Sequence, residues 1–251
     1  MFRTRTIKLT LAYDGTEFAG WQFQTNQRTV QDTLEQTLAK ITGKFARVSA
    51  SGRTDAGVHA LAQIVSFETE CALPTEVLWR ALNAELPRDM AAIALDEVPA
   101  GFHAQKKAKR KRYRYVICDG RARSVVRQRY AWQTFIRLDV PAMQRAATAL
   151  VGFHDFSSFQ GGGSQRETTA RKVFDLSLRR LEPPDGDVVE LEIEADGFLY
   201  NMVRNIVGTL IEVGLGKRPE SWVKEVLDSL DRRCAGQTAP PQGLFLVHVE
   251  Y

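Results

Sequence analysis

The residues from Ser49 to Ala60 include side chains that could do chemistry. Arg53, Asp55 and His59 lie near Gly52 and Gly57, between two apolar segments that are predicted to be strands. Glycine allows the backbone to turn sharply and to approach a ligand, and a short loop on a rigid scaffold can direct a carboxylate at that ligand. A polar turn with a local ion pair between Arg53 and Asp55 fits the same pattern, and structural ion pairs are common.

A block of basic residues follows in the middle of the chain. Residues 106–129 contain eleven basic residues and one acidic residue, Asp119, which leaves 23 basic and 29 acidic residues elsewhere. Such asymmetry indicates a polyanionic partner. The run from Lys106 to Arg114 leads into a predicted strand with Tyr113 and Tyr115 on one face. Cations beside aromatic rings suit phosphate neutralisation and base stacking, although a solvated face is the ordinary alternative.

A third candidate is Arg204, which lies in a predicted helix with an apolar face. A buried cation needs a partner, because an unpaired charge in the interior is costly. Glu212 and Asp196 are nearby candidates in sequence, and Asp55 is a distant one. Pairing with Arg204 would favour the ionised form of Asp55 and lower its pKa.

The hydrophobic periodicity predicts the elements that must position these residues. In the first half the order is strand, helix, strand, strand, helix, strand, which is the ferredoxin-like arrangement. The helix over 74–86 is expected to turn Val77, Leu78, Ala81 and Leu82 inward. We expect a domain boundary near residue 105. The predicted elements are strands 6–13, 47–51, 61–68 and 90–98, helices 29–41 and 74–86, then strands 112–118, 173–181, 188–195 and 244–251, and helices 141–151, 200–213 and 219–230.

Composition limits the class of protein. The chain has 251 residues, of which 44% are hydrophobic and 25% are charged, as in globular domains. No apolar run approaches the length of a membrane span and no signal-peptide core is evident, so we expect no membrane association and a cytoplasmic location. Three cysteines and four histidines are scattered, which indicates no metal site or disulfide framework. The cysteines are expected to be reduced and packed as small apolar residues.

Several strings together resemble one family. The string from Gly52 to His59, GRTDAGVH, is similar to the active-site signature of the TruA-type tRNA pseudouridine synthases. The string from Met202 to Gly208, MVRNIVG, resembles the family element that contributes a basic residue to the catalytic aspartate. Gly20-Trp21-Gln22 and the late string from Gln242 to Phe245 also match, in family order.

The resemblance implies a fold and an activity. The fold would be α+β, with two similar ferredoxin-like halves, 1–105 and 106–251, whose antiparallel sheets are flanked by helices around a central basic cleft. Such proteins convert uridine to pseudouridine at positions 38, 39 and 40 in the anticodon stem-loop of tRNA. They are homodimers and use no metal, nucleotide or flavin, so we expect tRNA as partner and no cofactor.

The resemblance also implies residue roles. Asp55 would act in the chemistry, with Arg204 holding it ionised, and Tyr113 would stack on the flipped uracil. Tyr115 shares the face of Tyr113 but fits a core position better. The apolar residue of the late string would exclude water near Asp55. Substrate contacts are expected from Arg53, Lys106, Lys107, Lys109, Arg110 and Arg112.

Two other functions deserve comparison with this one. A non-catalytic RNA-binding protein would explain the basic block and the tyrosines, but it would leave the Arg53-Thr54-Asp55 loop unexplained. A metal-dependent nuclease would need several clustered carboxylates, whereas this loop offers one carboxylate beside an arginine.

Overall fold

The computed structural model describes residues 3–163 and 168–251. The chain forms two compact units: unit 1 contains residues 1–109 and 245–251, and unit 2 contains residues 110–244. The first limit lies close to the expected boundary near residue 105. The last strand of the chain, however, lies mainly in unit 1, because its residues pair with a strand of that unit.

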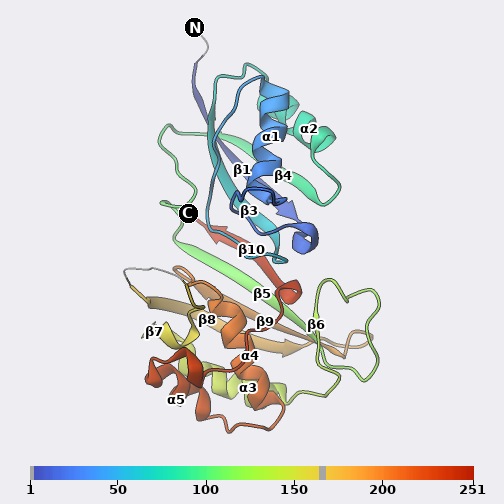
Figure 1. Cartoon of the computed structure of the whole chain (residues 1–251), viewed down its shortest axis with the longest axis vertical. Coiled ribbons are helices and arrows are strands. Elements are labelled where there is room, and N and C mark those ends of the chain that lie inside the picture. Colours follow the sequence, from blue (N-terminus) through green and yellow to red (C-terminus); the bar gives the residue numbers. More distant parts are fainter. Residues whose placement is uncertain (1–2, 164–167) are drawn as a thin grey trace. The chain divides into compact units, whose positions relative to one another are not determined.

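Unit 1 is built from five strands and two α-helices, which lie beside the strands in Figure 1. Its elements are β1 (Arg5–Tyr13), the 3-10 turn η1 (Gly15–Glu17), α1 (Val30–Thr42), β2 (Ser49–Ala50), β3 (His59–Thr69), α2 (Thr75–Glu85), β4 (Met90–Val98) and the strand β10 (Leu244–Glu250).

The local sequence explains these elements. Ile7, Leu9 and Leu11 alternate along β1 and are fully buried, as expected for a strand with one covered face. Helix α1 begins where the Thr29 hydroxyl accepts a hydrogen bond from the amide of Asp32, and it ends at Gly43, whose φ is 72°. A threonine cap and a left-handed glycine are common helix boundaries.

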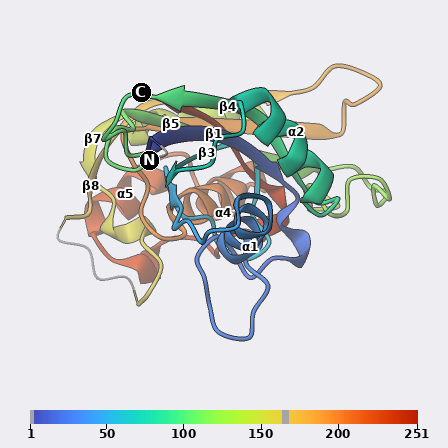
Figure 2. The ribbon, with the colours of Figure 1, turned by 90° about the horizontal axis from the view of Figure 1, so that it is seen from above.

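The sheet of unit 1 has the ferredoxin-like order. Strand β1 lies between β4 and β3, and β2 pairs with β3, all antiparallel. Figure 2 shows β4 with α2 beside it. The predicted order of elements in the first half is therefore confirmed.

Strand β10 adds a parallel partner to the first residues of β3, directly after the candidate loop, residues 51–58, which carries Asp55. Phe245 pairs with His59, and Leu246 pairs with Ala60. Strand β2 pairs with residues Val65 and Ser66 further along β3. Since β1 occupies the other edge of β3, β2 and β10 share one edge of this strand.

Unit 2 contributes antiparallel strands in the order β5-β9-β8-β7, with the short strand β6 parallel to β5, and Figure 1 shows α3, α4 and α5 gathered beside these strands. The predicted α+β class, with antiparallel strands flanked by helices, is confirmed. The elements are β5 (Arg110–Cys118), β6 (Trp132–Gln133), α3 (Val140–Ala147), η2 (Thr148–Leu150), β7 (Gly152–Asp155), η3 (Ser157–Phe159), β8 (Ala170–Arg180), β9 (Val188–Ala195), α4 (Met202–Gly214), α5 (Trp222–Ser229), η4 (Arg232–Cys234) and η5 (Pro241–Gly243).

Two expectations about packing are wrong. Val77 is 37% exposed, because α2 buries the face defined by Leu78 and Leu82 and Val77 lies one position round the helix from it. Cys234 is exposed, whereas Cys118 is buried as expected, and all three cysteines are free. Cys234 lies in the short turn η4, which buries none of its residues.

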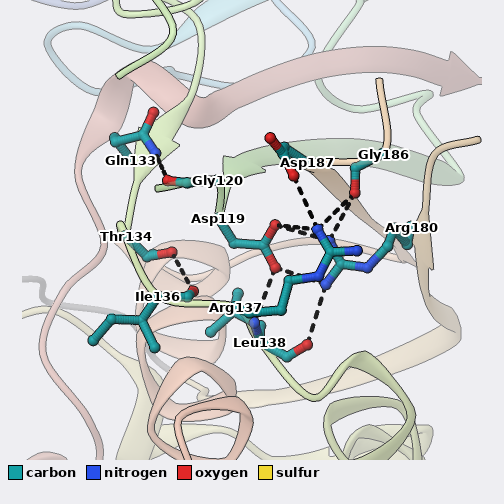
Figure 3. A network of polar contacts seen from close by, with 10 residues as sticks. All are labelled: Asp119, Gly120, Gln133, Thr134, Ile136, Arg137, Leu138, Arg180, Gly186 and Asp187. Atoms are coloured by element: carbon teal, nitrogen blue, oxygen red, sulfur yellow. Dashed lines mark hydrogen bonds and ion pairs between the residues drawn. The ribbon is translucent and has the colours of Figure 1, made fainter. Parts of the chain in front are cut away.

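A buried carboxylate joins three elements of unit 2 (Figure 3). Asp119, directly after β5, is 1% exposed. Its oxygens accept hydrogen bonds from Arg180 at the end of β8, at 2.6 and 2.8 Å, and from the amide of Leu138 before α3, at 2.9 Å. Burial alone would raise the pKa of Asp119, but these hydrogen bonds and the charges of Arg180 and Arg137 outweigh burial and lower its pKa.

The network predicts a pH-dependent contribution to stability. Asp119→Asn should lower the free energy of unfolding near pH 7 by about 3 kcal/mol, because it leaves Arg180 without its buried partner. A carboxyl group with a lowered pKa stabilises the fold above its unfolded pKa, about 3.9, and the contribution is lost as the pH falls through the folded pKa. Urea unfolding between pH 7 and pH 3 should show the difference from the parent shrinking at the acid end.

Asp187→Asn is the matched control. Asp187 pairs with Arg137 at 3.0 Å, but its side chain is 72% exposed, so its loss should change stability by less than about 1 kcal/mol. Equal effects of the two substitutions would show that Asp119 does not hold this network together.

Candidate active site

The candidate loop connects β2 to β3 in unit 1. Thr54 is buried, Asp55 is half-buried and Arg53 is exposed. Arg53 forms no ion pair with any described residue, so the local pair between Arg53 and Asp55 is absent. The loop therefore holds its carboxylate partly accessible while its arginine faces solvent.

The backbone of residues 18–21 supports this loop from behind. The amide of Trp21 donates a hydrogen bond to the carbonyl of Thr54 at 3.0 Å, and the amide of Gly57 donates to the carbonyl of Phe18 at 3.3 Å. Gly20 has a φ of 94°, and a Cβ there would lie 2.8 Å from the carbonyl oxygen of Thr54. Only glycine fits such an approach, so the Gly20-Trp21 pair is a support for the loop that carries Asp55.

A buried polar network holds the loop from the sheet side. The hydroxyl oxygens of Tyr13 and Thr54 lie 2.8 Å apart. Gln63 of β3 donates to the carbonyl of Gly52 at 2.7 Å, and the hydroxyl of Ser51 donates to Gln63 at 2.6 Å. Burial raises the pKa of Tyr13 to about 12, although its hydrogen bonds with Thr54 and Gln63 act in the opposite direction and lower the pKa. The phenol therefore stays protonated at neutral pH.

His59 ends the loop and connects it to the last strand. Its imidazole is 1% exposed and stacks on Phe245, with ring centroids 4.7 Å apart. The Nδ1 atom accepts a hydrogen bond from the amide of Gly15 at 3.0 Å. Phe245 belongs to the late string whose apolar residue was expected near the site; it lies at the start of β10, and its ring covers His59.

The predicted stacking residue lies on β5 of unit 2. Tyr113 is buried and meets Phe198 edge to face, with centroids 5.0 Å apart at 85°. Tyr115 is fully buried, and its hydroxyl donates to the carbonyl of Pro240 at 2.7 Å. Burial raises the pKa of Tyr115, which the charge of Arg204 opposes. Tyr115 therefore has the core position expected for it.

Arg204 lies in the first turn of α4. Its guanidinium donates to the carbonyl of Ala239 at 2.7 Å and to the side chain of Asn201 at 2.9 Å. Glu212 pairs with Lys217, and the carboxylate of Asp196 accepts from the amide of Lys172. Two neutral oxygens thus help to orient the guanidinium.

The basic run from Lys106 to Arg114 separates into two parts. On the outer face of β5, Arg112 pairs with Glu194 at 2.9 Å and Arg114 pairs with Glu192 at 2.7 Å. The ladder of charges also includes the pairs Arg110–Glu194 and Arg179–Glu190. By contrast Lys106, Lys107 and Lys109 are exposed and form no ion pair with the residues that the structure describes.

Several residues that support the site have no marker in the sequence. Tyr13 and Gln63 lie at buried positions of strands, where a core role is the ordinary expectation. Gly208 of α4 approaches the carbonyl oxygen of Gln237 so closely that a Cβ would lie 1.7 Å from it. The glycine within an apolar helical pattern was the available signal for this approach.

Asp55 belongs to unit 1, whereas Tyr113 and Arg204 belong to unit 2. The expected pairing of Asp55 with Arg204 therefore stays a prediction. Within the described ranges no group of three His, Cys, Asp or Glu side chains could hold a metal ion. In the same ranges, no helix has the length and apolar character needed to cross a bilayer.

Comparison with known proteins identifies the family. The tRNA pseudouridine synthase family matches residues 10–105 and 146–251. The chain therefore belongs to the tRNA pseudouridine synthases, which are isomerases that convert uridine in tRNA to pseudouridine. Both the candidate loop and the Arg204 helix lie within the matched ranges.

Three similar proteins indicate the subgroup within this family, because each of them is named tRNA pseudouridine synthase A. The protein from Halalkalibacterium halodurans is 47% identical over 96% of this chain and 90% of its own length. That from Thermoanaerobacter sp. (strain X514) is 44% identical over 98% of this chain and its entire length. That from Myxococcus xanthus is 44% identical over 98% of this chain and 91% of its own.

The network behind the loop predicts that Tyr13→Phe lowers kcat by about 10-fold, because the loop around Asp55 loses one of its supports. KM should change little, since the phenol is buried. Steady-state kinetics on tRNA measures both. Thr54→Ser, which keeps the hydroxyl, should retain most of the rate that Thr54→Val loses, and equal rates for these two variants would contradict a role of the hydrogen bond.

Proposed function

We propose that this protein converts uridine to pseudouridine at positions 38, 39 and 40 in the anticodon stem-loop of tRNA. Family membership supports the reaction, and the similarity to proteins named tRNA pseudouridine synthase A supports the positions. The observation that carries the proposal is the half-buried carboxylate of Asp55, on a loop whose neighbouring residues are fixed by Tyr13, Gly20 and Gln63.

The reaction breaks the N1–C1′ bond, turns the uracil and joins C5 to C1′. The hydrogen on C5 leaves as a proton, and N1 gains one, so atoms and electrons balance without an oxidant or reductant. Asp55 can serve as an anion in three ways: attack at C1′, attack at C6, or removal of a proton from the ribose. All three need an ionised carboxylate, and no metal or cofactor is required for any of them.

Access to the uridine requires base flipping, because a base paired within a stem hides the reacting atoms. Tyr113 would stack on the flipped uracil, and its edge-to-face contact with Phe198 supports a fixed ring orientation. Arg53 is exposed beside Asp55, which suits contact with a phosphate during flipping.

Arg204 would supply the positive charge that favours the ionised form of Asp55. The string around Arg204 supports this role, as do the two oxygens that orient its guanidinium. The resemblance further supports a cytoplasmic homodimer, and a basic cleft flanked by the two halves of each chain. In this proposal Asp55 is the nucleophile or proton acceptor, and Arg204 is its counter-charge.

The test is tritium release from tRNA labelled at C5 of uridine, with EDTA present. The parent should release tritium, and Asp55→Asn should lose more than about 10³-fold of the rate, as expected when the reacting group itself is removed. Filter binding should show unchanged affinity for tRNA. Loss of binding equal to the loss of rate would contradict a chemical role, and bound tRNA without release by the parent would favour the non-catalytic alternative.

Arg204→Met, measured in the same tritium-release assay, tests whether the charge of Arg204 favours the ionised form of Asp55. Without the guanidinium, the acid limb of the rate–pH profile should move to higher pH, because the neutral form of Asp55 persists further. A uniform loss of rate with an unmoved profile would assign Arg204 a purely structural role.

The lysines are the best candidates for phosphate contacts. Arg110 and Arg112 would have to exchange a carboxylate of β9 for a phosphate, whereas Lys106, Lys107 and Lys109 carry uncompensated charge. Replacing these three lysines with glutamine should weaken tRNA binding and flatten the plot of log K against log[salt], by about 0.7 to 0.9 per lost phosphate contact. An unchanged slope in salt titrations would remove them from the interface.

A further inference from the structure

An exposed loop of unusual composition follows residues 18–21, the segment whose backbone supports the Asp55 loop in unit 1. Residues 22–28 have the sequence QFQTNQR, and every one of them is exposed. The loop holds four side-chain amides, no acidic residue and one aromatic ring, Phe23, which is 49% exposed. The single ring has no apolar neighbour within the loop.

The backbone of Phe23 is held in place from the interior. The amide of Phe23 donates to the side-chain oxygen of Gln31 at 3.1 Å, and Gln31 donates in turn to Glu35 at 3.0 Å. Glu35 is 2% exposed and also accepts from the amide of Val48 at 3.0 Å. An exposed ring whose backbone is tied to a buried carboxylate loses little freedom on binding, which favours affinity.

Further hydrogen bonds close the loop at its base. The side chain of Gln24 donates to the carbonyl of Ala19 at 2.9 Å, and the amide of Ala19 donates to the carbonyl of Arg28 at 2.8 Å. Arg28 itself pairs with Asp89 through two hydrogen bonds. Its charge is therefore engaged, and the outer surface of the loop presents amides and the ring.

The loop is continuous with the support of the catalytic loop. It follows Gly20 and Trp21, whose backbone contacts Thr54, the neighbour of Asp55. The position of Phe23 relative to Asp55 is thus fixed within one unit by a short run of bonded backbone. The nucleotides that neighbour a uridine at Asp55 are therefore the candidate ligand of this surface.

We propose that Phe23 is a second stacking residue, which holds an unpaired base of the anticodon loop while the target uridine is at Asp55. The proposal rests on the proposed function. Base stacking on aromatic rings is the usual mode of recognition for unpaired RNA, and side-chain amides bond to base edges, sugars and phosphates. A protein partner is disfavoured, because the core of a protein interface needs several clustered apolar side chains.

The test uses an anticodon stem-loop RNA with 2-aminopurine at each unpaired loop position in turn. The full-length parent should quench the fluorescence at one or more positions on binding. Phe23→Ala should abolish that quenching and weaken binding by about 5-fold or more, the typical effect of removing a stacked ring. Phe23→Trp should restore both. The rate at saturating RNA should change by less than about 2-fold.

Phe45→Ala is the matched control, since Phe45 is an exposed ring of the same unit, 64% exposed. It should bind RNA and quench as the parent does. Phe23→Leu keeps an apolar side chain and should fail like the alanine variant while melting at the parent's temperature. Normal quenching by Phe23→Ala, or equal defects in the Phe23 and Phe45 variants, would overturn the proposal.

The two proposals fail separately. If the parent releases no tritium from labelled tRNA, the proposed reaction is wrong whatever the fluorescence shows. If the parent releases tritium and Phe23→Ala quenches and binds normally, the reaction stands and the stacking role of Phe23 is wrong.

Discussion

The geometry of the candidate site depends on one close approach of two backbones. The amide of Trp21 bonds to the carbonyl of Thr54, and this bond exists because Gly20 lets the chain pass within van der Waals contact of the loop. Any side chain at Gly20 would push the two segments apart. The backbone around Asp55 is therefore fixed by contacts between main-chain atoms, and these contacts do not use its carboxylate.

Charge is distributed less simply than the composition indicates. Seven cations lie between Lys106 and Arg114, yet Arg112 and Arg114 face Glu194 and Glu192 across two strands. Individual surface pairs contribute little to stability, but together they remove much of the positive field from this face of the sheet. The lysines before β5 and the exposed residues Arg121 and Arg123 after it keep positive charge that a polyanion can meet.

The elements were predictable where the information is local. The spacing of apolar residues and the cap at Thr29 define α1, and β9 has its expected bounds because its residues alternate clearly. Strand β7 was missed because it has four residues, two of them exposed. The loop with Asp55 could be found from its residue types. Its supports could not, because Tyr13 and Gln63 meet it only through strand register, and register depends on contacts between distant segments.

The pairing of β10 with β3 has a consequence for the order in which the protein forms. Unit 1 contains the Asp55 loop, but the ring that covers His59 comes from Phe245, which follows the whole of unit 2 in the chain. During synthesis, unit 1 stays incomplete at this edge until unit 2 has been translated. A nascent chain thus exposes His59 and one unpaired edge of β3. The Asp55 loop gains its contact with β10 only after both units have been translated.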